Sequence, residues 1–140
     1  QEAIIRLSRV GFDNCLGFLD GGFQSWKNSN NHIDSIDSVS AKELEKIISS
    51  VSLIDVRKKG ERNNGYLNES ISMPLDDFKD DIKGIDKKNK HFIHCAGGYR
   101  SMIAASLFKR NGFMSIVDVS GGFTSIRKEK FNIIEKSCTN

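Results

Sequence analysis

The sequence has few of the features that mark membrane, disulfide-rich or nucleic-acid-binding proteins. No apolar run in the 140 residues approaches the roughly 18 residues that a membrane-spanning helix needs, so we expect a soluble chain with no membrane partner. The three cysteines, Cys15, Cys95 and Cys138, lie far apart without CxxC pairing, which disfavours a disulfide framework and a zinc site. They favour a reducing, cytoplasmic location. We expect neither a metal site nor a cofactor.

The sequence also lacks the dense basic block that is typical of a nucleic-acid binder. Lys and Arg number 21 against 18 Asp and Glu, giving a net charge of +3. These charges form no dense basic block with interleaved aromatic residues, so we interpret them as a solvated surface and expect no nucleic-acid partner. With 38% hydrophobic residues, the chain is long enough for one complete domain and too short for two.

An internal repeat divides the chain. Residues 3–26 resemble residues 104–126: in both, an amphipathic helical pattern is followed by Gly-Phe, a short apolar strand and Gly-Gly-Phe, with a serine two residues later. The alternative is coincidence, because many α/β proteins share this order of helix, glycine and strand. We predict that residues 1–27 are the C-terminal remnant of a preceding related module and that residues 28–38 are a polar linker.

Residues 39–128 show the pattern of a complete α/β domain. Ser40 and Glu43 form a capping box before a short helix. Strands are predicted at residues 51–56, 70–74, 90–94 and 115–119, the second one stopped by the only proline, Pro74, and helices at 75–85 and 101–112. This alternation predicts a mainly parallel sheet with helices on both faces. For the tail, residues 129–140, the sequence does not decide between a short strand and no regular structure.

The stretch HCAGGYRS, residues 94–101, carries the chemistry. It follows a predicted strand and precedes a helix, which places Cys95 at the edge of the sheet where ligands bind. Two glycines allow the amides from Ala96 to Ser101 to point at the sulfur, and the helix adds its positive end. Both effects lower the pKa of a thiol from its usual value of about 8.5. Arg100 supplies a fixed positive charge.

The alternative for any cysteine is that it packs as a small, inert hydrophobic residue. We adopt that interpretation for Cys15 and Cys138. For Cys95, the adjacent glycines and the arginine favour a reactive thiolate. His94 precedes it at a strand end, where side chains alternate between faces, so we expect His94 to support the scaffold rather than act as a base.

Four segments together resemble the rhodanese-like sulfurtransferase domain, in order: IDVR at 54–57 with Glu61, SISMPL at 70–75, HCAGGYRSMIAA at 94–105 and VSGGFTSI at 119–126. The resemblance implies a three-layer fold and a Cys95 persulfide, loaded from thiosulfate or a small persulfide such as glutathione persulfide and unloaded to a thiol or cyanide. It implies that Cys95 and Arg100 are catalytic and that Asp55 and Arg57 fix the loop. The residues expected to bind substrate are Ala96, Gly97, Gly98, Tyr99 and Ser101.

The chain also resembles bacterial fusion proteins in which a metallo-β-lactamase-fold persulfide dioxygenase precedes two rhodanese-like domains. That resemblance implies an upstream metallo-β-lactamase-fold domain as partner. The sequence departs from the family pattern at Gly65-Tyr66-Leu67, where Gly-His-Ile is usual, and at Asn68 and Glu69. These departures bear on donor preference more than on the cysteine chemistry.

Two other functions remain open. Cysteine-dependent phosphatases and arsenate reductases of related fold have five residues between cysteine and arginine, whereas only Ala96, Gly97, Gly98 and Tyr99 lie between Cys95 and Arg100. The smaller ring favours a sulfur atom over a tetrahedral oxyanion. A non-catalytic interaction module is the second alternative, and the intact cysteine, glycines and arginine argue against it.

Overall fold

The computed structural model describes residues 1–8 and 13–135, and divides the chain into two compact units, Gln1–Ser35 and Ile36–Asn140. The first unit contains α1 (Glu2–Ser8) and α2 (Gly22–Asn28). The short strand predicted before the first Gly-Gly-Phe does not form, since residues 13–19 have no regular structure. A strand needs a neighbour to satisfy its backbone hydrogen bonds. The large apolar side chains of this unit are exposed: Leu16, Phe18, Leu19, Phe23 and Trp26.

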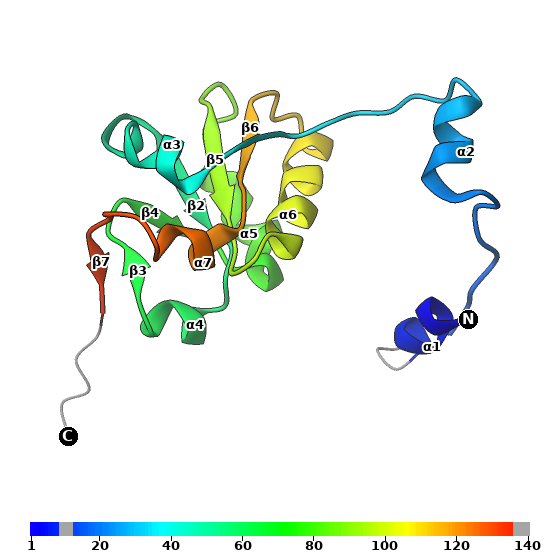
Figure 1. Cartoon of the computed structure of the whole chain (residues 1–140), viewed down its shortest axis with the longest axis horizontal. Coiled ribbons are helices and arrows are strands. Elements are labelled where there is room, and N and C mark those ends of the chain that lie inside the picture. The colour runs from blue at the N-terminus through cyan, green and yellow to red at the C-terminus, as the bar shows by residue number, and fades with distance from the viewer. Residues whose placement is uncertain (9–12, 136–140) are drawn as a thin grey trace. The chain divides into compact units, whose positions relative to one another are not determined.

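The second unit is built on a five-stranded, all-parallel sheet in the order β1-β6-β5-β2-β4 (Figure 1). A separate two-stranded antiparallel ladder joins β3 to β7. The strands are β1 (Asp37–Val39), β2 (Ser52–Asp55), β3 (Tyr66–Leu67), β4 (Ser70–Ser72), β5 (His91–His94), β6 (Ile116–Val119) and β7 (Ile133–Ile134).

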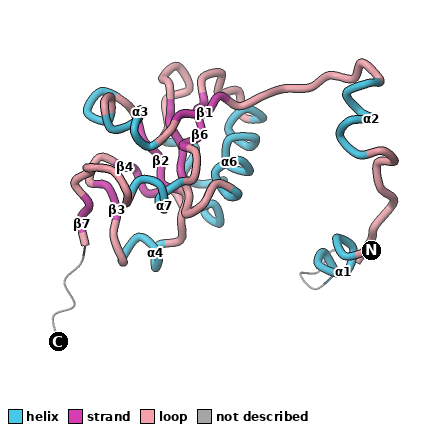
Figure 2. Tube along the Cα trace, in the orientation of Figure 1, coloured by secondary structure: helices cyan, strands magenta, loops and turns pink. Residues whose placement is uncertain are grey.

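Helices cover both faces of this sheet (Figures 1 and 2). One core lies between the sheet and α5 and α6, with Phe78 and Phe108 packed against Ile54 and Ile93. The other lies between the sheet and α3 and α7. The helical elements are α3 (Ala41–Glu45), η1 (Ile48–Ser50), α4 (Lys59–Asn63), η2 (Leu75–Asp77), α5 (Phe78–Asp81), η3 (Ile82–Gly84), α6 (Tyr99–Arg110) and α7 (Gly122–Ile126).

The predicted fold class, a mainly parallel sheet flanked by helices, is confirmed. The Ser40 capping box is present, with the Glu43 amide donating to Ser40 Oγ over 3.2 Å and the Ser40 amide donating to Glu43 Oε2 over 2.8 Å. The helix predicted at 75–85 is divided into η2, α5 and η3. No helix among the described residues is long and apolar enough to cross a membrane.

The short strands β1 and β3 were not predicted, and a strand in the tail was left open. β1 pairs Asp37 with Val117 and Val39 with Val119, although Asp37 and Ser38 belong to the segment predicted as linker. Its sequence, DSV, has too little apolar alternation to signal a strand. β7 answers the question left open for the tail, because Ile133 and Ile134 pair with β3. The domain boundaries stay a prediction. The prediction for Cys138 falls outside the described residues.

Candidate active site

Cys95 lies directly after β5, at the carboxyl end of the parallel sheet, and is 1% exposed. The turn from Cys95 to Gly98 leads into α6, which begins at Tyr99. Gly98 has a φ of 114°, which is favourable only for glycine. In this conformation its amide points at the sulfur, with 3.0 Å between N and Sγ. Gly97 does not need a positive φ, so Gly98 alone makes the turn depend on glycine.

The surroundings of the sulfur favour its anionic form. Burial alone would raise the pKa of the Cys95 thiol. The hydrogen bond between Cys95 and the Ser101 hydroxyl, together with hydrogen bonds from the amides of Ser101, Gly98 and Gly97, outweighs burial and lowers the pKa. The thiol is therefore more acidic than a free cysteine, which increases the fraction of the nucleophilic thiolate at neutral pH.

Arg100 is paired with an acidic side chain, and the charge of Cys95 also contributes to raising its pKa. Its guanidinium makes a bidentate ion pair with Glu61 of α4, with Nη1–Oε2 and Nη2–Oε1 distances of 2.5 and 2.8 Å. The hydrogen bond from Arg100 lowers the pKa of Glu61 and, in return, raises the pKa of Arg100. Glu61 also accepts from the Lys58 amide over 3.2 Å. Glu61 is thus the partner of a backbone amide and a basic side chain.

The other loop residues have different surroundings. Tyr99 is 90% exposed, so its ring extends into solvent instead of forming a wall of the site. The Ala96 carbonyl faces α7, where it accepts from the Thr124 amide and hydroxyl, both over 3.0 Å. Of the residues predicted to bind substrate, Gly97, Gly98 and Ser101 lie around the sulfur, whereas the side chain of Tyr99 does not.

Helix α7 packs against the backbone of the cysteine loop and supports it. The Phe123 amide donates to the Cys95 carbonyl over 2.7 Å. Gly122, with a φ of 54°, comes so close that a Cβ atom there would lie 2.4 Å from the Cys95 carbonyl oxygen. The sequence showed Gly-Gly-Phe as a repeated segment and as part of one of the four family-like segments. Its role as the back support of the cysteine loop was missed, because sequence alone gives no sign of which backbone the glycine approaches.

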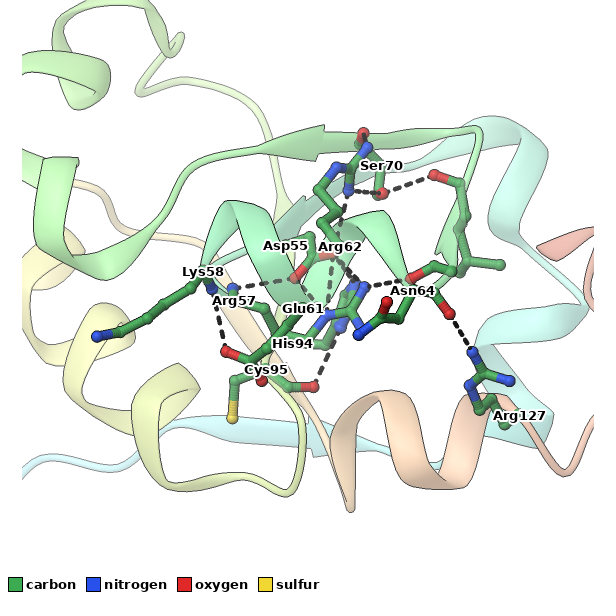
Figure 3. Close-up of polar contacts among 12 residues, drawn as sticks. Asp55, Arg57, Lys58, Glu61, Arg62, Asn64, Ser70, His94, Cys95 and Arg127 are labelled. Atoms are coloured by element: carbon green, nitrogen blue, oxygen red, sulfur yellow. Dashed lines mark hydrogen bonds and ion pairs between the residues drawn. The ribbon is translucent and has the colours of Figure 1, made fainter. Parts of the chain in front are cut away.

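Asp55 and Arg57 form a buried ion pair beneath the loop (Figure 3). Arg57 donates to the Asp55 carboxylate from Nε and Nη2, the latter over 2.7 Å, and also to the Gly65 carbonyl. Arg62, which the sequence analysis did not single out, donates to Asp55 over 3.0 Å and to Ser70. Burial alone would raise the pKa of Asp55, but the hydrogen bonds and charge of Arg57 hold it below its usual range.

The Phe123 ring connects the Asp55–Arg57 ion pair to the cysteine loop. The Arg57 guanidinium carbon lies 3.7 Å from the centroid of the Phe123 ring, a cation–π contact. Phe123 in turn holds the Cys95 carbonyl through its amide. Asp55 and Arg57 therefore support the loop through α7 and do not contact the sulfur.

His94 is fully buried and stacks against Phe123, with ring centroids 6.0 Å apart. Burial lowers its pKa, against the opposing effect of Asp55, whose Oδ2 lies 3.9 Å from its Nε2. The ring is therefore neutral at neutral pH. Strand alternation puts the side chains of His94 and Cys95 on opposite sides of the sheet, which agrees with a scaffold role.

The architecture and this loop match a known family. The family model for the rhodanese-like domain matches residues 40–129, more than half of the chain. The chain belongs to the rhodanese-like domain family. This rhodanese-like domain is similar to two solved structures: a rhodanese-related protein from Thermoplasma volcanium (29% identity, TM-score 0.66, covering 71% of this chain and 99% of that one) and a rhodanese-like domain protein from Staphylococcus aureus (28%, 0.65, 73% and 100%).

A curated relative has a more specific name. The tRNA uridine(34) hydroxylase of Buchnera aphidicola is 27% identical over 125 residues, which cover 81% of this chain and 36% of the relative. The rhodanese-like chain thus spans about a third of that protein's length. A metallo-β-lactamase-fold partner is not shown by these matches and stays a prediction.

The arrangement can stabilise an anionic sulfur species. It combines an acidified thiol, amides directed at the sulfur and a loop braced by α7. Among residues 1–8 and 13–135, no group of three or more His, Cys, Asp and Glu side chains could hold a metal ion. The chemistry available from these side chains is nucleophilic.

Proposed function

We propose that this rhodanese-like domain is a sulfurtransferase that carries sulfur as a persulfide on Cys95. The observation that supports this most is the buried thiol whose pKa is lowered by Ser101, Gly98 and Gly97. Such a thiol is nucleophilic without a neighbouring base, and His94 is neutral on the other side of the sheet.

The reaction has two displacement steps. The Cys95 thiolate attacks the sulfane sulfur of thiosulfate or a small persulfide. A new S–S bond forms, the donor's S–S bond breaks, and its electron pair leaves with sulfite or a thiolate. A thiol or cyanide then attacks the outer sulfur, and Cys95 leaves as the thiolate. The amides stabilise the anionic outer sulfur between the two steps, and Arg100 adds its positive charge nearby.

Loop size supports sulfur transfer over phosphate hydrolysis. Only four residues separate Cys95 from Arg100, and the Gly98 amide already lies 3.0 Å from Sγ. We propose a cytoplasmic location and, on the resemblance described above, an upstream metallo-β-lactamase-fold partner.

A second candidate comes from the curated relative: this chain would be the rhodanese-like part of a protein that modifies uridine 34 of tRNA. The match to the Buchnera aphidicola hydroxylase covers 81% of the chain. The cations near the site argue against direct tRNA binding, because Lys58, Lys59 and Arg100 are paired with Asp76, Asp77 and Glu61. Unpaired cations are what a phosphate backbone needs.

Intact-protein mass spectrometry tests the proposal. The protein is incubated separately with thiosulfate and with glutathione persulfide. We expect the mass of one added sulfur atom, its loss in Cys95→Ser, and its retention in the control variant Cys15→Ser, whose thiol is exposed outside the domain. No added sulfur with either donor overturns the proposal and favours a non-catalytic module.

Two further assays separate the alternatives. Steady hydrolysis of an aryl phosphate by wild type but not Cys95→Ser would favour a phosphatase. Hydroxylation of uridine 34 in a tRNA assay that depends on Cys95, without sulfur loading, would favour the second candidate. If sulfur loading and release to cyanide both depend on Cys95, neither alternative is needed.

A further inference from the structure

Glu61 has no step in the proposed reaction, although it binds the arginine that follows the cysteine loop. Arg100 lies in the first turn of α6. Both of its terminal nitrogens donate to Glu61, with Nη1–Oε2 and Nη2–Oε1 distances of 2.5 and 2.8 Å. The side chains of Arg100 and Glu61 are 30% and 37% exposed, so solvent and small anions reach the pair.

The Glu61 carboxylate is held in place by α4. Glu61 lies in the first turn of this helix and accepts from the Lys58 amide over 3.2 Å (Figure 3). A side chain that is already fixed in this way loses little further conformational entropy when it binds a bidentate partner. Glu61 therefore neutralises Arg100 and leaves little uncompensated positive charge at the start of α6.

The other charged groups described around the site are also paired. The buried carboxylate of Asp55 accepts from two arginines, Arg57 and Arg62. Two lysines at the start of α4 are paired with aspartates of η2. Apart from these lysine–aspartate pairs, the cations and anions balance when the thiol is ionised: Arg57, Arg62 and Arg100 against Asp55, Glu61 and the Cys95 thiolate. Loss of the Glu61 charge alone would make this group of side chains positive.

We propose that Glu61 is a specificity-determining residue: by neutralising Arg100, it makes Cys95 select weakly charged sulfur donors, such as small persulfides, over the dianion thiosulfate. With either donor, Sγ forms a bond to the sulfane sulfur, the donor's S–S bond breaks, and its electron pair leaves with a thiolate or sulfite. Thiosulfate brings two negative charges toward a thiolate, so it depends most on uncompensated positive charge nearby. The proposal rests on the proposed function, because it names which of the donors is preferred.

The rate of persulfide formation, followed by intact-protein mass spectrometry, tests this selection. The second-order rate constant is measured with thiosulfate and with 2-hydroxyethyl persulfide, which carries at most one charge. Glu61→Gln keeps the length and an acceptor oxygen but removes the charge. We expect about a 3-fold increase for each negative charge on the donor, so about 10-fold for thiosulfate and about 3-fold or less for the persulfide. Equal increases, or no increase with thiosulfate, overturn the proposal.

Two variants serve as controls. Asp80→Asn removes the same charge from an exposed carboxylate that is paired with Lys83, and we expect both rate constants to stay at the wild-type values. Glu61→Asp keeps the charge but shortens the side chain, so we expect the ratio of the two constants to stay near that of wild type even if both constants fall. The proposal is overturned if Asp80→Asn reproduces Glu61→Gln, or if both Glu61 variants change the ratio equally. Circular dichroism establishes that each variant is folded.

Alkylation distinguishes a failure of this proposal from a failure of sulfur transfer, because it needs no sulfur donor. In a Cys15→Ser, Cys138→Ser background, the Cys95 thiolate displaces iodide from the anion iodoacetate or from neutral iodoacetamide. We expect Glu61→Gln to raise the ratio of the iodoacetate rate to the iodoacetamide rate about 3-fold at low salt. An unchanged ratio overturns the proposal even where sulfur loading succeeds. A raised ratio without sulfur loading supports charge selection at Cys95 and overturns sulfur transfer.

The wild-type protein provides a test that does not depend on the folding of Glu61→Gln. Because the charges around Cys95 balance, we expect the ratio of the iodoacetate rate to the iodoacetamide rate to change less than about 2-fold between about 0.05 and about 0.5 M NaCl. An uncompensated Arg100 would attract iodoacetate, and salt would screen that attraction. A steep fall of the ratio with salt in wild type therefore overturns the proposal.

Discussion

The two Gly-Gly-Phe segments have the same local backbone and different surroundings. Gly21 and Gly22 have φ values of 71° and 59°, and Gly121 and Gly122 have 72° and 54°. In both segments the serine amide that follows, in Ser25 and in Ser125, donates to the first glycine's carbonyl over 3.3 Å. Yet the Phe23 side chain is 66% exposed and that of Phe123 only 5%.

The second glycine marks the difference most clearly. A Cβ atom at Gly22 would meet nothing within 4 Å, whereas one at Gly122 would collide with the carbonyls of Cys95 and Ala96. The turn is therefore encoded locally, by two glycines that adopt positive φ. Its role as a support depends on the loop that it faces. The prediction that residues 1–27 end a preceding module remains a prediction.

Alanine at the second glycine is expected to have the largest effect. In Gly122→Ala the new methyl group overlaps the Cys95 carbonyl oxygen, 2.4 Å away, so either α7 or the loop must move. We expect the free energy of unfolding to fall by about 2–4 kcal/mol and persulfide formation on Cys95 to fall at least about 10-fold. Thermal denaturation and mass spectrometry measure the two effects.

Gly22→Ala is the matched control for this prediction. It has the same positive φ but no overlap, so we expect persulfide formation at the wild-type rate. Equal losses in the two variants would mean that glycine is needed for its backbone conformation alone and not for close approach.

Leucine in place of the phenylalanine is expected to have the next largest effect. Phe123→Leu keeps an apolar side chain in the core but removes the ring beneath Arg57. We expect about 1–2 kcal/mol of destabilisation, from lost cation–π energy and imperfect packing, measured by chemical denaturation. Phe23→Leu should change stability by less than about 0.5 kcal/mol. A comparable loss of stability in Phe23→Leu would contradict the exposed position of the Phe23 ring.

Low pH is expected to affect the second Gly-Gly-Phe segment more than the first. The lowered pKa of Asp55 means that its carboxylate stabilises the fold above the unfolded-state value of about 3.9, and that this stability is lost as pH falls through the folded-state pKa. Because Asp55 holds Arg57 under Phe123, the second segment loses its support there. We expect the circular dichroism melt of wild type to shift to lower temperature below pH 4, and less so in Asp55→Asn.

Trp26, the only tryptophan, lies in α2 and reports on the first segment. Asp55 is in the other unit, so we expect Trp26 fluorescence to change little over the same pH range. A fluorescence transition that coincides with the melt would show that acid does not distinguish the two segments.

The smallest difference is expected at the first glycine. Alanine at Gly21 or Gly121 must adopt a φ near 70°, and in both cases its methyl group meets the following serine, at Ser25 Cβ or Ser125 Oγ. The Ser125 hydroxyl can rotate away from the methyl at position 121, whereas Ser25 Cβ, 2.9 Å from the methyl at position 21, must shift slightly. The backbone cost of the positive φ, about 1 kcal/mol, is common to both variants. We expect similar small decreases in melting temperature for the two variants. A much larger decrease for Gly121→Ala would show that Gly121, like Gly122, is needed for tertiary packing.

Much of the architecture could be predicted because the strands that form the centre of the sheet are short apolar runs. β2, β5 and β6 were predicted from VSLIDV, KHFIH and SIVDV, which are short and mainly apolar. β1 was not, because Asp37 and Ser38 are polar and its place depends on hydrogen bonds to β6. The pairing of β7 with β3 also depends on residues far apart in sequence.

The candidate site was predictable where the signal is local. Cys95, Gly98 and Ser101 lie in one turn and were found from spacing. Arg62 reaches Asp55 only through the fold, from α4. The charge of Arg100 was expected near the sulfur, but its binding to Glu61 depends on how α4 packs beside α6.

The close approach of Gly122 gives a criterion for sorting uncharacterised chains. A domain that retains the cysteine loop but has a larger residue at this place must have reshaped either the loop or α7, since the two backbones cannot both keep their positions. An intact cysteine is therefore insufficient evidence of a competent loop. The residue opposite its carbonyl is a second test that can be read directly from an aligned sequence.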